Sequence, residues 1–548
     1  MKNNSDENQQ AYRKQRNKCV HLLKKAKKDF YGNLKPSSIC DNKTFWKTVK
    51  PIFTDKSVST DNIILVENNK IINDDVAISE LFNDFFSNAV KNLNVEPSDL
   101  FSFDQNLFIE DVNDNDPILK SIRKYESHPS IVKIKKNFSD PANFSFIPTD
   151  MQSVTKEIFK LMESTACPIE SLPVKIWKFN YDILGPKIVI DFNSAIKTGI
   201  FPCNLKRADI SPIFKNGEKQ SKLNYRPVSI LSALSKVFER LMCVQIDNYM
   251  SDRLSIFLCG FRKGMSAQNC LLFMIEKLRK SYDKGDKGGI LLTDLSKAFD
   301  CLVHDLLIAK LQAYGFDYLS LKLIYSYLTD RFQRVRINSN FSSWKEILHG
   351  VPQGSILGPD LFNINSNDLF LFLLLDSVNY ADDNSPFAFG ESIPSVISQI
   401  EKEAEILINW IRNNGQKANP GKFHLILSDS GQTHSVNKID TFNIESSNCK
   451  RLLGIKIDSK LNFDEHVSDI FSKATQKLHA LSRVSHFMTL DQRKVVMKSF
   501  IMSQFGYCPL VWIFHRRKLN NRITLDCQIN GEGRLINFLK LFFQISIF

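Results

Sequence analysis

Apolar residues recur at helical spacing at both ends of a longer mixed region. Near residue 150, Val154, Ile158 and Leu161 lie three or four residues apart, which places them on one face of a helix. Farther on, between residues 461 and 515, the same spacing forms a continuous stripe of Val467, Ile470, Phe471, Ala474, Leu478 and Leu481. An earlier stretch, residues 11–32, sets apolar positions among many lysines and arginines. The pattern predicts helices in all three places.

Strand-like runs alternate with helical blocks between about 150 and 457. Ile290, Leu291 and Leu292 form a short buried-strand run. Residues 377–389 read SVNYADDNSPFAF, in which two extended segments flank a polar tip. This pattern predicts a β-hairpin within a fold of mixed helix and strand, of the α+β class.

Three carboxylates fall where these strands end. Asp294 follows the buried run, and Asp382 and Asp383 occupy the predicted hairpin turn. Taken alone, Asp294 could cap a following helix, and aspartates are common in turns. Together, three neighbouring like charges repel one another, and a divalent cation would relieve that repulsion. Carboxylate oxygens suit Mg²⁺, and two such ions support phosphoryl transfer.

Net charge, cysteine spacing and the length of apolar runs limit the kinds of partner that the chain can have. The 548 residues carry 72 Lys+Arg against 59 Asp+Glu, a formal net charge of +13, which favours a polyanionic partner such as nucleic acid. No two of the 11 cysteines lie two to four residues apart, which argues against a zinc ribbon. The polar N-terminus and the lack of a long apolar run predict a soluble protein of the nucleus or cytoplasm, without a membrane partner.

A glycine-rich loop lies between the carboxylate segments. Residues 350–359 read GVPQGSILGP, and Pro359 suits the first turn of a following helix. Glycines allow a backbone to approach a nucleotide or a template base closely. The alternative is an ordinary turn between two elements.

Six motifs in a fixed order carry a family resemblance: NYRPVSIL (224–231), GFRKG (260–264), LLTDLSKAFDCLVHD (291–305), GVPQGSILGP (350–359), YADD (380–383) and LLGIKID (452–458). This series resembles the reverse transcriptase of non-LTR retrotransposons, specifically the jockey-like mobile elements. The likeness extends over about 145 to 521.

The resemblance implies a right-hand polymerase with fingers, a palm sheet that carries helices on one side, and a helical thumb. It divides the chain into a basic, mainly helical connector (1–91), a linker (92–144), a helical segment leading into the fingers (145–201), the reverse transcriptase domain of fingers and palm (202–458), the thumb (459–521) and a divergent tail (522–548).

The resemblance also assigns roles. Asp294, Asp382 and Asp383 would be the catalytic carboxylates and would hold two Mg²⁺ ions, with Mn²⁺ as an alternative. Tyr380 would lie against the primer end, and Phe299 would exclude the 2′-hydroxyl of a ribonucleotide. The other nucleotide-binding positions would be Lys215, Arg226, Gln353, Gly354 and Lys422. For Arg226 and Lys422, a surface ion pair or a solvated side chain is the alternative.

Several positions depart from the family pattern. The chain is expected to lack the endonuclease domain that precedes the polymerase in full-length relatives. Asp360, Asn365 and Ser366 are polar where the family is apolar, which costs on the order of 1–3 kcal/mol for each unpaired group that is buried. Pro386 removes a hydrogen-bond donor from its strand. After Asn521 the thumb-like pattern stops.

The function predicted from the sequence is RNA-directed DNA polymerisation. The partners would be an RNA template, a DNA primer and dNTPs, within a ribonucleoprotein of the element RNA. Residues 11–32 would contact RNA, and the alternatives for them are a solvated helix face or a localisation signal. One alternative is a catalytically inactive, nucleic-acid-binding remnant of such an element. Another is an RNA-templated RNA polymerase, which Phe299 argues against.

Overall fold

The computed structural model describes residues 6–32, 63–88, 90–91, 116–139, 143–428, 435–439 and 442–513. Its chain forms two compact units, one of Asn62–Leu453 and one of Met1–Asp61 with Gly454–Phe548. The larger unit mixes helices and strands, which confirms the predicted α+β class. The tail predicted over 522–548 lies outside the described residues, as do residues 33–62 of the predicted connector.

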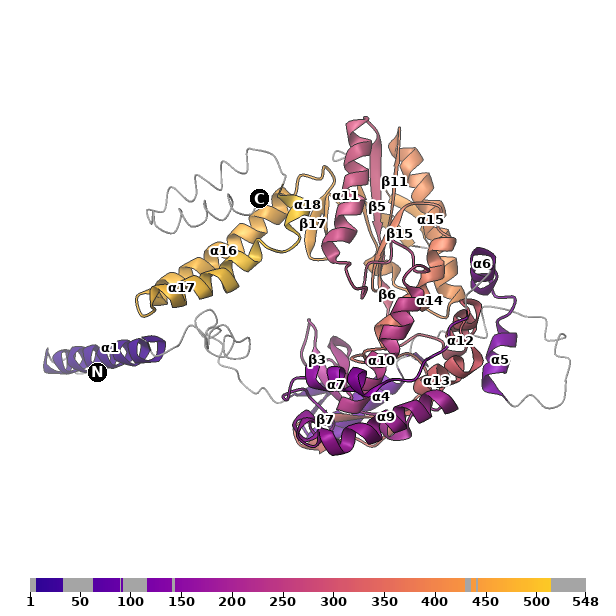
Figure 1. Cartoon of the computed structure of the whole chain (residues 1–548). Coiled ribbons are helices and arrows are strands. Elements are labelled where there is room, and N and C mark those ends of the chain that lie inside the picture. Colours follow the sequence, from indigo (N-terminus) through magenta and orange to yellow (C-terminus); the bar gives the residue numbers. More distant parts are fainter. Residues whose placement is uncertain are drawn as a thin grey trace. The chain divides into compact units, whose positions relative to one another are not determined.

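A four-stranded antiparallel sheet lies at the centre of the larger unit. Its strand order is β10 (Ser377–Tyr380), β11 (Asp383–Gly390), β5 (Lys287–Leu292) and β13 (His424–Leu427). The helices α11 (Ala267–Asp283) and α15 (Ile393–Asn413) flank it (Figure 1). A Cβ on Gly288 would meet Tyr282 of α11, and one on Gly289 would meet Val396 of α15. Because successive strand residues face opposite sides, both faces carry a helix, and the prediction of helices on one side was wrong.

A second sheet carries the helix α4 (Asp75–Ser87). Its order is β4 (Tyr225–Ile230), β3 (Arg207–Phe214), β7 (Arg331–Ile337) and β8 (Asn340–Phe341), with β9 (Lys345–Ile347) paired to β7. The side chain of Asp74 accepts a hydrogen bond from Ala77 N and so caps α4. Ile78 and Phe82 of α4 are fully buried against this sheet. Residues 63–88 therefore belong to the larger unit rather than to a separate connector.

One helical core joins the two sheets. Its apolar residues come from α7 (Met151–Lys160), α9 (Tyr181–Thr198), α10 (Ala233–Met250), α12 (His304–Ala313), α13 (Tyr318–Leu328) and α14 (Gly358–Asn367), with α8 (Val174–Phe179) beside α9. A buried ion pair crosses this core, because Lys310 Nζ lies 2.6 Å from Asp368 Oδ1. Trp410 Nε1 donates to the second oxygen of Asp368 at 2.8 Å. Both charges are thus hydrogen bonded, as buried charges must be.

The stretch predicted as a linker contains two packed helices. Within 92–144, the structure describes α5 (Pro117–Lys124) and α6 (Pro129–Asn137), and Ile118, Ile131 and Ile134 are buried in the helical core. Each helix begins with a proline in its first turn after a capping side chain, Asp116 or His128. The linker prediction is wrong for this part, because polar, proline-containing composition also suits short helices, and here the prolines stand in the first turn of each helix.

The smaller unit is mainly helical where it is described. It contains α1 (Asp6–Gly32), β17 (Ile455–Asp458), α16 (Asp464–Ser485), α17 (Leu490–Val496), a π-helical turn (Met497–Ile501) and α18 (Pro509–Trp512). Ala474 and Leu481 of the predicted stripe are buried against Phe500 and Ile501. The helices predicted from the stripe and over 11–32 are confirmed. In the described part of the chain, no helix is long and apolar enough to cross a membrane.

The remaining strands are short. They form the pairs β1 (Leu65–Glu67) with β2 (Lys70–Ile72), β6 (Leu295–Ser296) with β12 (Lys417–Ala418), and β14 (Ser435–Ile439) with β15 (Phe442–Glu445). The strand β16 (Cys449–Leu452) ends the larger unit. The β6–β12 pair matters most for the site, because it joins the segment after Asp294 to the segment before Lys422.

Candidate active site

The hairpin β10–β11 and the end of β5 bring the three predicted carboxylates together. The predicted hairpin is confirmed, but Tyr380 pairs with Asp383, so the two-residue turn consists of Ala381 and Asp382, and Asp383 is the first residue of β11. Thr293 N donates to Asn384 O at 3.0 Å, and the Thr293 hydroxyl donates to the same oxygen at 2.9 Å. Thr293 therefore lies directly opposite Asn384, and the residues that follow Thr293 and precede Asn384 meet at the same edge of the sheet.

The electrostatics agree with this proximity. Burial raises the pKa of Asp383 to about 6, and the nearby charges of Asp382 and Asp294 contribute to the increase, while Lys215 opposes it. A carboxyl beside two other carboxylates resists ionisation, because its negative charge is repelled. The site is thus a focus of negative charge, and Lys215 is near enough to act on Asp383.

Asp294 is held by the segment around Lys422. The ammonium of Lys422 lies 2.9 Å from Asp294 Oδ2, and the amide of Asn419 donates to the same oxygen at 3.5 Å. The backbone N–H of Asn419 also donates to Asp294 O at 3.0 Å. Lys422 is more than half exposed, so its ammonium can leave the carboxylate when another cation arrives. The structure therefore places Lys422 beside the predicted carboxylates.

The donor set fits a hard divalent cation by type. Carboxylate oxygens are the ligands that Mg²⁺ and Mn²⁺ prefer, and the repulsion at Asp383 is what a bound cation would relieve. Within the described residues, no group of three or more His, Cys, Asp or Glu side chains is already arranged to enclose a metal ion. The fit therefore rests on the chemistry of the three carboxylates, with substrate phosphates as the expected further ligands.

The glycine-rich loop is hydrogen bonded to the segment that carries Phe299. Gly350 N donates to Leu302 O at 2.9 Å, and Val351 N donates to Phe299 O at 3.1 Å. A Cβ on Gly350, whose φ is +75°, would lie 2.6 Å from Phe299 O, so no other residue fits there. The loop is thereby attached to the backbone of the predicted sugar-contacting residue.

Phe299 itself is held between two rings. It stacks on Phe362 of α14 with a centroid distance of 4.5 Å and meets Phe261 edge-on at 5.7 Å. Aromatic pairs of this geometry add to the stabilisation from burial. Its ring is therefore fixed in place, which is what exclusion of a substrate hydroxyl by contact requires.

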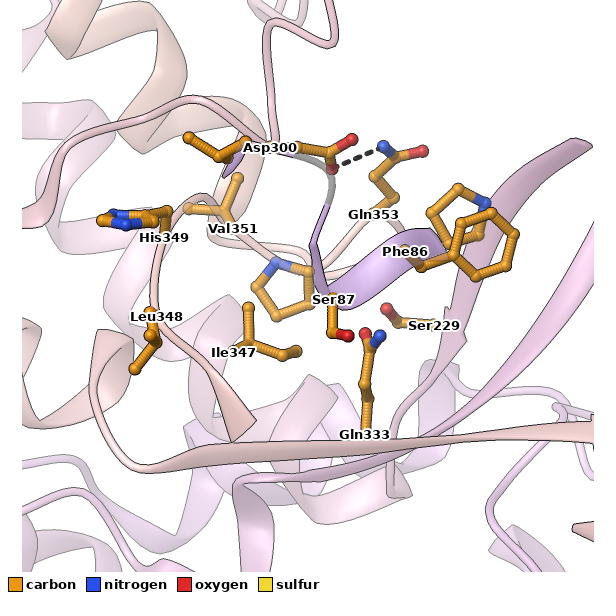
Figure 2. Close-up of a pocket in the computed structure, with 13 residues that line it drawn as sticks. Phe86, Ser87, Ser229, Asp300, Gln333, Ile347, Leu348, His349, Val351 and Gln353 are labelled. Carbon is orange, nitrogen blue, oxygen red and sulfur yellow. Dashed lines mark hydrogen bonds between the residues drawn. The ribbon is translucent and has the colours of Figure 1, made fainter. Parts of the chain in front are cut away.

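Gln353 and Gly354 meet the second sheet. Ser229 N, in β4, donates to Gln353 O at 2.7 Å. A Cβ on Gly354, with φ +120°, would lie 2.8 Å from Ser229 O. The amide of Gln353 donates to Asp300 Oδ1 at 2.8 Å, at the wall of a pocket that residues of α4, β4 and β7 also line (Figure 2). The loop thus joins the second sheet to the carboxylate segment.

Lys215 and Arg226 lie on the hairpin formed by β3 and β4. Arg226 pairs with Ile213, and Lys215 N donates to Asn224 O at 2.8 Å just beyond the end of β3. Both side chains are exposed. Lys215 is close enough to affect the pKa of Asp383, whereas no described contact joins Arg226 to the carboxylates.

Three positions that the sequence reasoning did not single out support this site. A Cβ on Gly260 would lie 2.3 Å from Ala381 N, so only glycine fits against the YADD turn. His304, with its pKa lowered to about 4 by burial, donates from Nε2 to Gly350 O at 2.7 Å. Glu239, fully buried, accepts from Ile356 N at 2.7 Å. Of these three positions, only Glu239 could be suspected from the sequence, because it is a charged residue within a mostly apolar helical stretch.

The comparisons with known proteins identify this region. Residues 214–457 match the family model described as reverse transcriptase (RNA-dependent DNA polymerase). This segment is a reverse transcriptase domain. It contains every site residue named above except those of α4, and its boundaries enclose both sheet segments that carry the three aspartates.

The chain is similar to retrotransposon proteins of Drosophila melanogaster. It is 26% identical over 361 residues to the probable RNA-directed DNA polymerase from transposon BS, covering 62% of this chain and 39% of that protein. It is 28% identical over 342 residues to the probable RNA-directed DNA polymerase from transposon X-element, covering 59% of this chain and 37% of that protein. It is 27% identical over 308 residues to the RNA-directed DNA polymerase from mobile element jockey, covering 54% of this chain and 33% of that protein. The chain thus matches two fifths or less of the length of these relatives. Together with the family match, the similarity confirms the predicted resemblance to non-LTR reverse transcriptases.

The polar positions of α14 are buried in the domain. Asn365 and Ser366 are 2% and 5% exposed, and Asn365 Nδ2 has no hydrogen-bond partner among the described residues. Burial raises the pKa of Asp360 to about 7, with the charge of Asp247 acting in the same direction. The cost predicted for an unpaired polar group therefore applies to Asn365.

Pro386 lies at an interruption of its strand pairing. The register between β11 and β5 runs from Phe387 to Gly390, and pairing resumes only at Asn384 opposite Thr293. Pro386 pairs with Ser377 of β10 on the other side. The missing donor that the sequence predicted coincides with this gap, and the carboxylate-bearing turn forms beyond it.

Proposed function

We propose that the chain is an RNA-directed DNA polymerase that extends a primer 3′-hydroxyl with deoxynucleotides on an RNA template. The observation that carries this proposal is the pairing of Thr293 with Asn384, which sets Asp294 beside Asp382 and Asp383 within a reverse transcriptase domain. The polymerase names of the relatives belong to those proteins, and the similarity supports extending them to this chain.

Asp294, Asp382 and Asp383 would hold two Mg²⁺ ions, or Mn²⁺ in their place. When bound, such ions lower the pKa of the attacking hydroxyl and neutralise charge on the leaving oxygen. The primer oxygen forms a bond to the α-phosphorus as the bond to the bridging oxygen breaks, and pyrophosphate leaves. Lys215 and Arg226 would bind the triphosphate, Arg226 through its planar fork. Tyr380, beside the YADD turn, would contact the primer end.

Lys422 is proposed to serve the departing pyrophosphate. Its ammonium lies 2.9 Å from Asp294 Oδ2. With a divalent cation held by Asp294, Lys422 would be available to exchange its contact with Asp294 for the negative charge of the leaving pyrophosphate. The exchange needs only a side-chain rotation, because Lys422 is exposed.

The domain architecture follows the same proposal. The four-stranded sheet would be the palm, because it carries the carboxylates. The second sheet, with Lys215 and Arg226, would form the fingers, and the helices of 459–521 would be the thumb, of which residues 514–521 lie outside the described part. Gln353 and Gly354 would support the nucleotide where these two sheets meet.

The element RNA would be both template and partner in a ribonucleoprotein, in the nucleus or the cytoplasm. The helix α1 carries eight lysines and arginines between Arg13 and Lys28, and each of its residues from 8 to 30 is exposed. A helix of this charge can neutralise several phosphates. We propose it as an RNA contact outside the polymerase domain.

Primer extension tests the proposed function. Purified chain with Mg²⁺ should extend a DNA primer on a heteropolymeric RNA template with dNTPs, and rNTPs should be used far less. Phe299→Ala should admit rNTPs, because removing the ring opens the space beside the sugar. Extension by rNTPs alone would favour the RNA polymerase alternative. Lack of extension by folded, RNA-binding protein would favour an inactive remnant, an alternative that the unpaired Asn365 amide supports.

A further inference from the structure

The backbone of Gln353 is fixed from two sides. Its carbonyl accepts from Ser229 N in β4 at 2.7 Å. Three residues earlier, Gly350 is attached to Leu302 through its N–H and to His304 through its carbonyl. The position of the residue is thus set by β4, by the segment at Leu302 and by the first residue of α12. The orientation of its side-chain amide is a separate matter, because that group is linked to the backbone by three rotatable bonds.

A single side chain restrains the amide. Gln353 Nε2 donates to Asp300 Oδ1 at 2.8 Å, and in Figure 2 the amide nitrogen points toward Asp300 while its oxygen points away. Ser87, Ser229 and Gln333 line the same pocket. Within the described residues, none of these three side chains is hydrogen bonded to the Gln353 amide. Asp300 alone determines which end of the amide faces the wall.

A carboxylate is suited to this task. Asp300 Oδ1 accepts from the NH₂ end of the amide, which leaves the amide oxygen on the other side. Burial raises the pKa of Asp300, and the hydrogen bond from Gln353 and the charge of Lys297 act in the opposite direction. Within the described residues, the side-chain oxygen of Gln353 accepts no hydrogen bond. The amide is therefore presented with its acceptor available, on the loop that faces the nucleotide in the proposed function. The position of Asp300 is itself set by Phe299, whose carbonyl accepts from Val351 N.

We infer that Asp300 is a positioning residue for nucleotide binding, which orients the Gln353 amide so that its oxygen accepts a hydrogen bond from a hydroxyl group of the incoming nucleotide. This inference rests on the proposed polymerase function and names a determinant of its substrate affinity. Asp300 acts through Gln353 and does not touch the reacting atoms. Its replacement should therefore change the KM for the nucleotide more than kcat.

The test is a double-mutant cycle in the primer-extension assay. Asp300→Ala should raise the KM for dNTP roughly tenfold, about the effect of removing one hydrogen bond to a charged group, with little change in kcat. Asp300→Asn keeps an acceptor oxygen and should stay close to the native KM. Gln353→Ala should raise the KM by itself, and adding Asp300→Ala to it should have no further effect.

Asp305 supplies the matched control. It lies five residues along the same segment, but its carboxylate accepts from Ser121 of α5 at 3.0 Å. Asp305→Ala should leave the KM for dNTP unchanged. An Asp300→Ala effect that persists in the Gln353→Ala background, or that appears only in kcat, would overturn the inference. If the native chain itself fails to extend a primer, the proposed function fails instead, which separates the two outcomes.

Discussion

At the scale of single residues, the site depends on close contacts between segments that lie far apart in the sequence. Asp294, Asp382 and Asp383 were predicted from adjacent strand ends, and the pairing of Thr293 with Asn384 provides that adjacency. Gly260 was missed, because a glycine within GFRKG gives no sign of the residue it will touch. Its contact with Ala381 joins positions 121 residues apart in the chain, and only the fold shows it.

Replacing Gly260 with alanine should disrupt the YADD turn. The added Cβ would lie 2.3 Å from Ala381 N, a backbone atom that cannot move without shifting Asp382. We expect primer extension to fall at least about tenfold, since a small misplacement of a catalytic group costs far more than that. Gly506→Ala is the control, because its Cβ would meet nothing nearer than 3.8 Å. Equal activity of the two variants would remove the proposed role of Gly260.

Asp360 should make the stability of the domain depend on pH. Burial raises the pKa of its carboxyl from 3.8 in the unfolded chain to about 7 in the folded protein. The folded state thus holds the proton more tightly, so the contribution of this group to stability is fully present below pH 4 and is lost as the pH rises to 7. Asp360→Asn should be more stable than the native chain at pH 8, by on the order of 1–3 kcal/mol.

Urea unfolding at pH 5 and pH 8 measures this difference. The native chain should lose stability relative to Asp360→Asn between these two values. A constant difference between the two proteins across this range would mean that Asp360 is ionised in the fold at both.

Whole elements were predicted well where apolar spacing was regular. The hairpin around YADD and the helix beginning near Asp464 follow directly from their patterns. The two helices between 116 and 139 were missed, because each is shorter than three turns and its composition is polar. Helices of that length are stabilised by packing against other elements, which a local pattern does not reveal.

The helix α4 should be a structural part of the polymerase domain, although it precedes the matched family segment. Phe82 is fully buried and meets the ring of Tyr225 in β4 at 4.9 Å. Phe82→Ala should destabilise the larger unit by about 3–5 kcal/mol. Val76→Ala, on the exposed side of the same helix, should change stability by less than about 0.5 kcal/mol. Urea unfolding of both variants measures this contrast, and equally small effects would mean that α4 is not part of this cooperative unit.

At the scale of the molecule, a net charge of +13 and the helix α1 predict salt-dependent RNA binding. Replacing Lys24, Lys25, Lys27 and Lys28 with glutamine should weaken binding, because fewer RNA phosphates are then neutralised. The slope of log K against log salt should become shallower by about 0.7 for each phosphate that the helix no longer neutralises. Replacement of the same four by arginine keeps the charge and is the control. An unchanged slope in the glutamine variant would place the RNA-binding surface elsewhere.

The residues of the candidate site can be predicted from the sequence more completely than the packing of the elements around them. The order of the six motifs was enough to predict the reverse transcriptase domain, because each motif has few alternatives at that spacing. The packing of α4 on the second sheet, and the attachment of the loop at Gly350 to Leu302, depend on contacts between distant segments. Neither leaves a periodic signal in the chain.

The central claim is that Asp294, Asp382 and Asp383 form a metal-dependent polymerase site. Its most direct test is extension of a DNA primer on an RNA template by the native chain and by an Asp382→Asn, Asp383→Asn double variant, each with Mg²⁺ and dNTPs. We predict extension by the native chain and none by the variant, with both equally folded and equally able to bind RNA. Equal extension by the two proteins would contradict the claim, because the carboxylates would then have no part in the reaction.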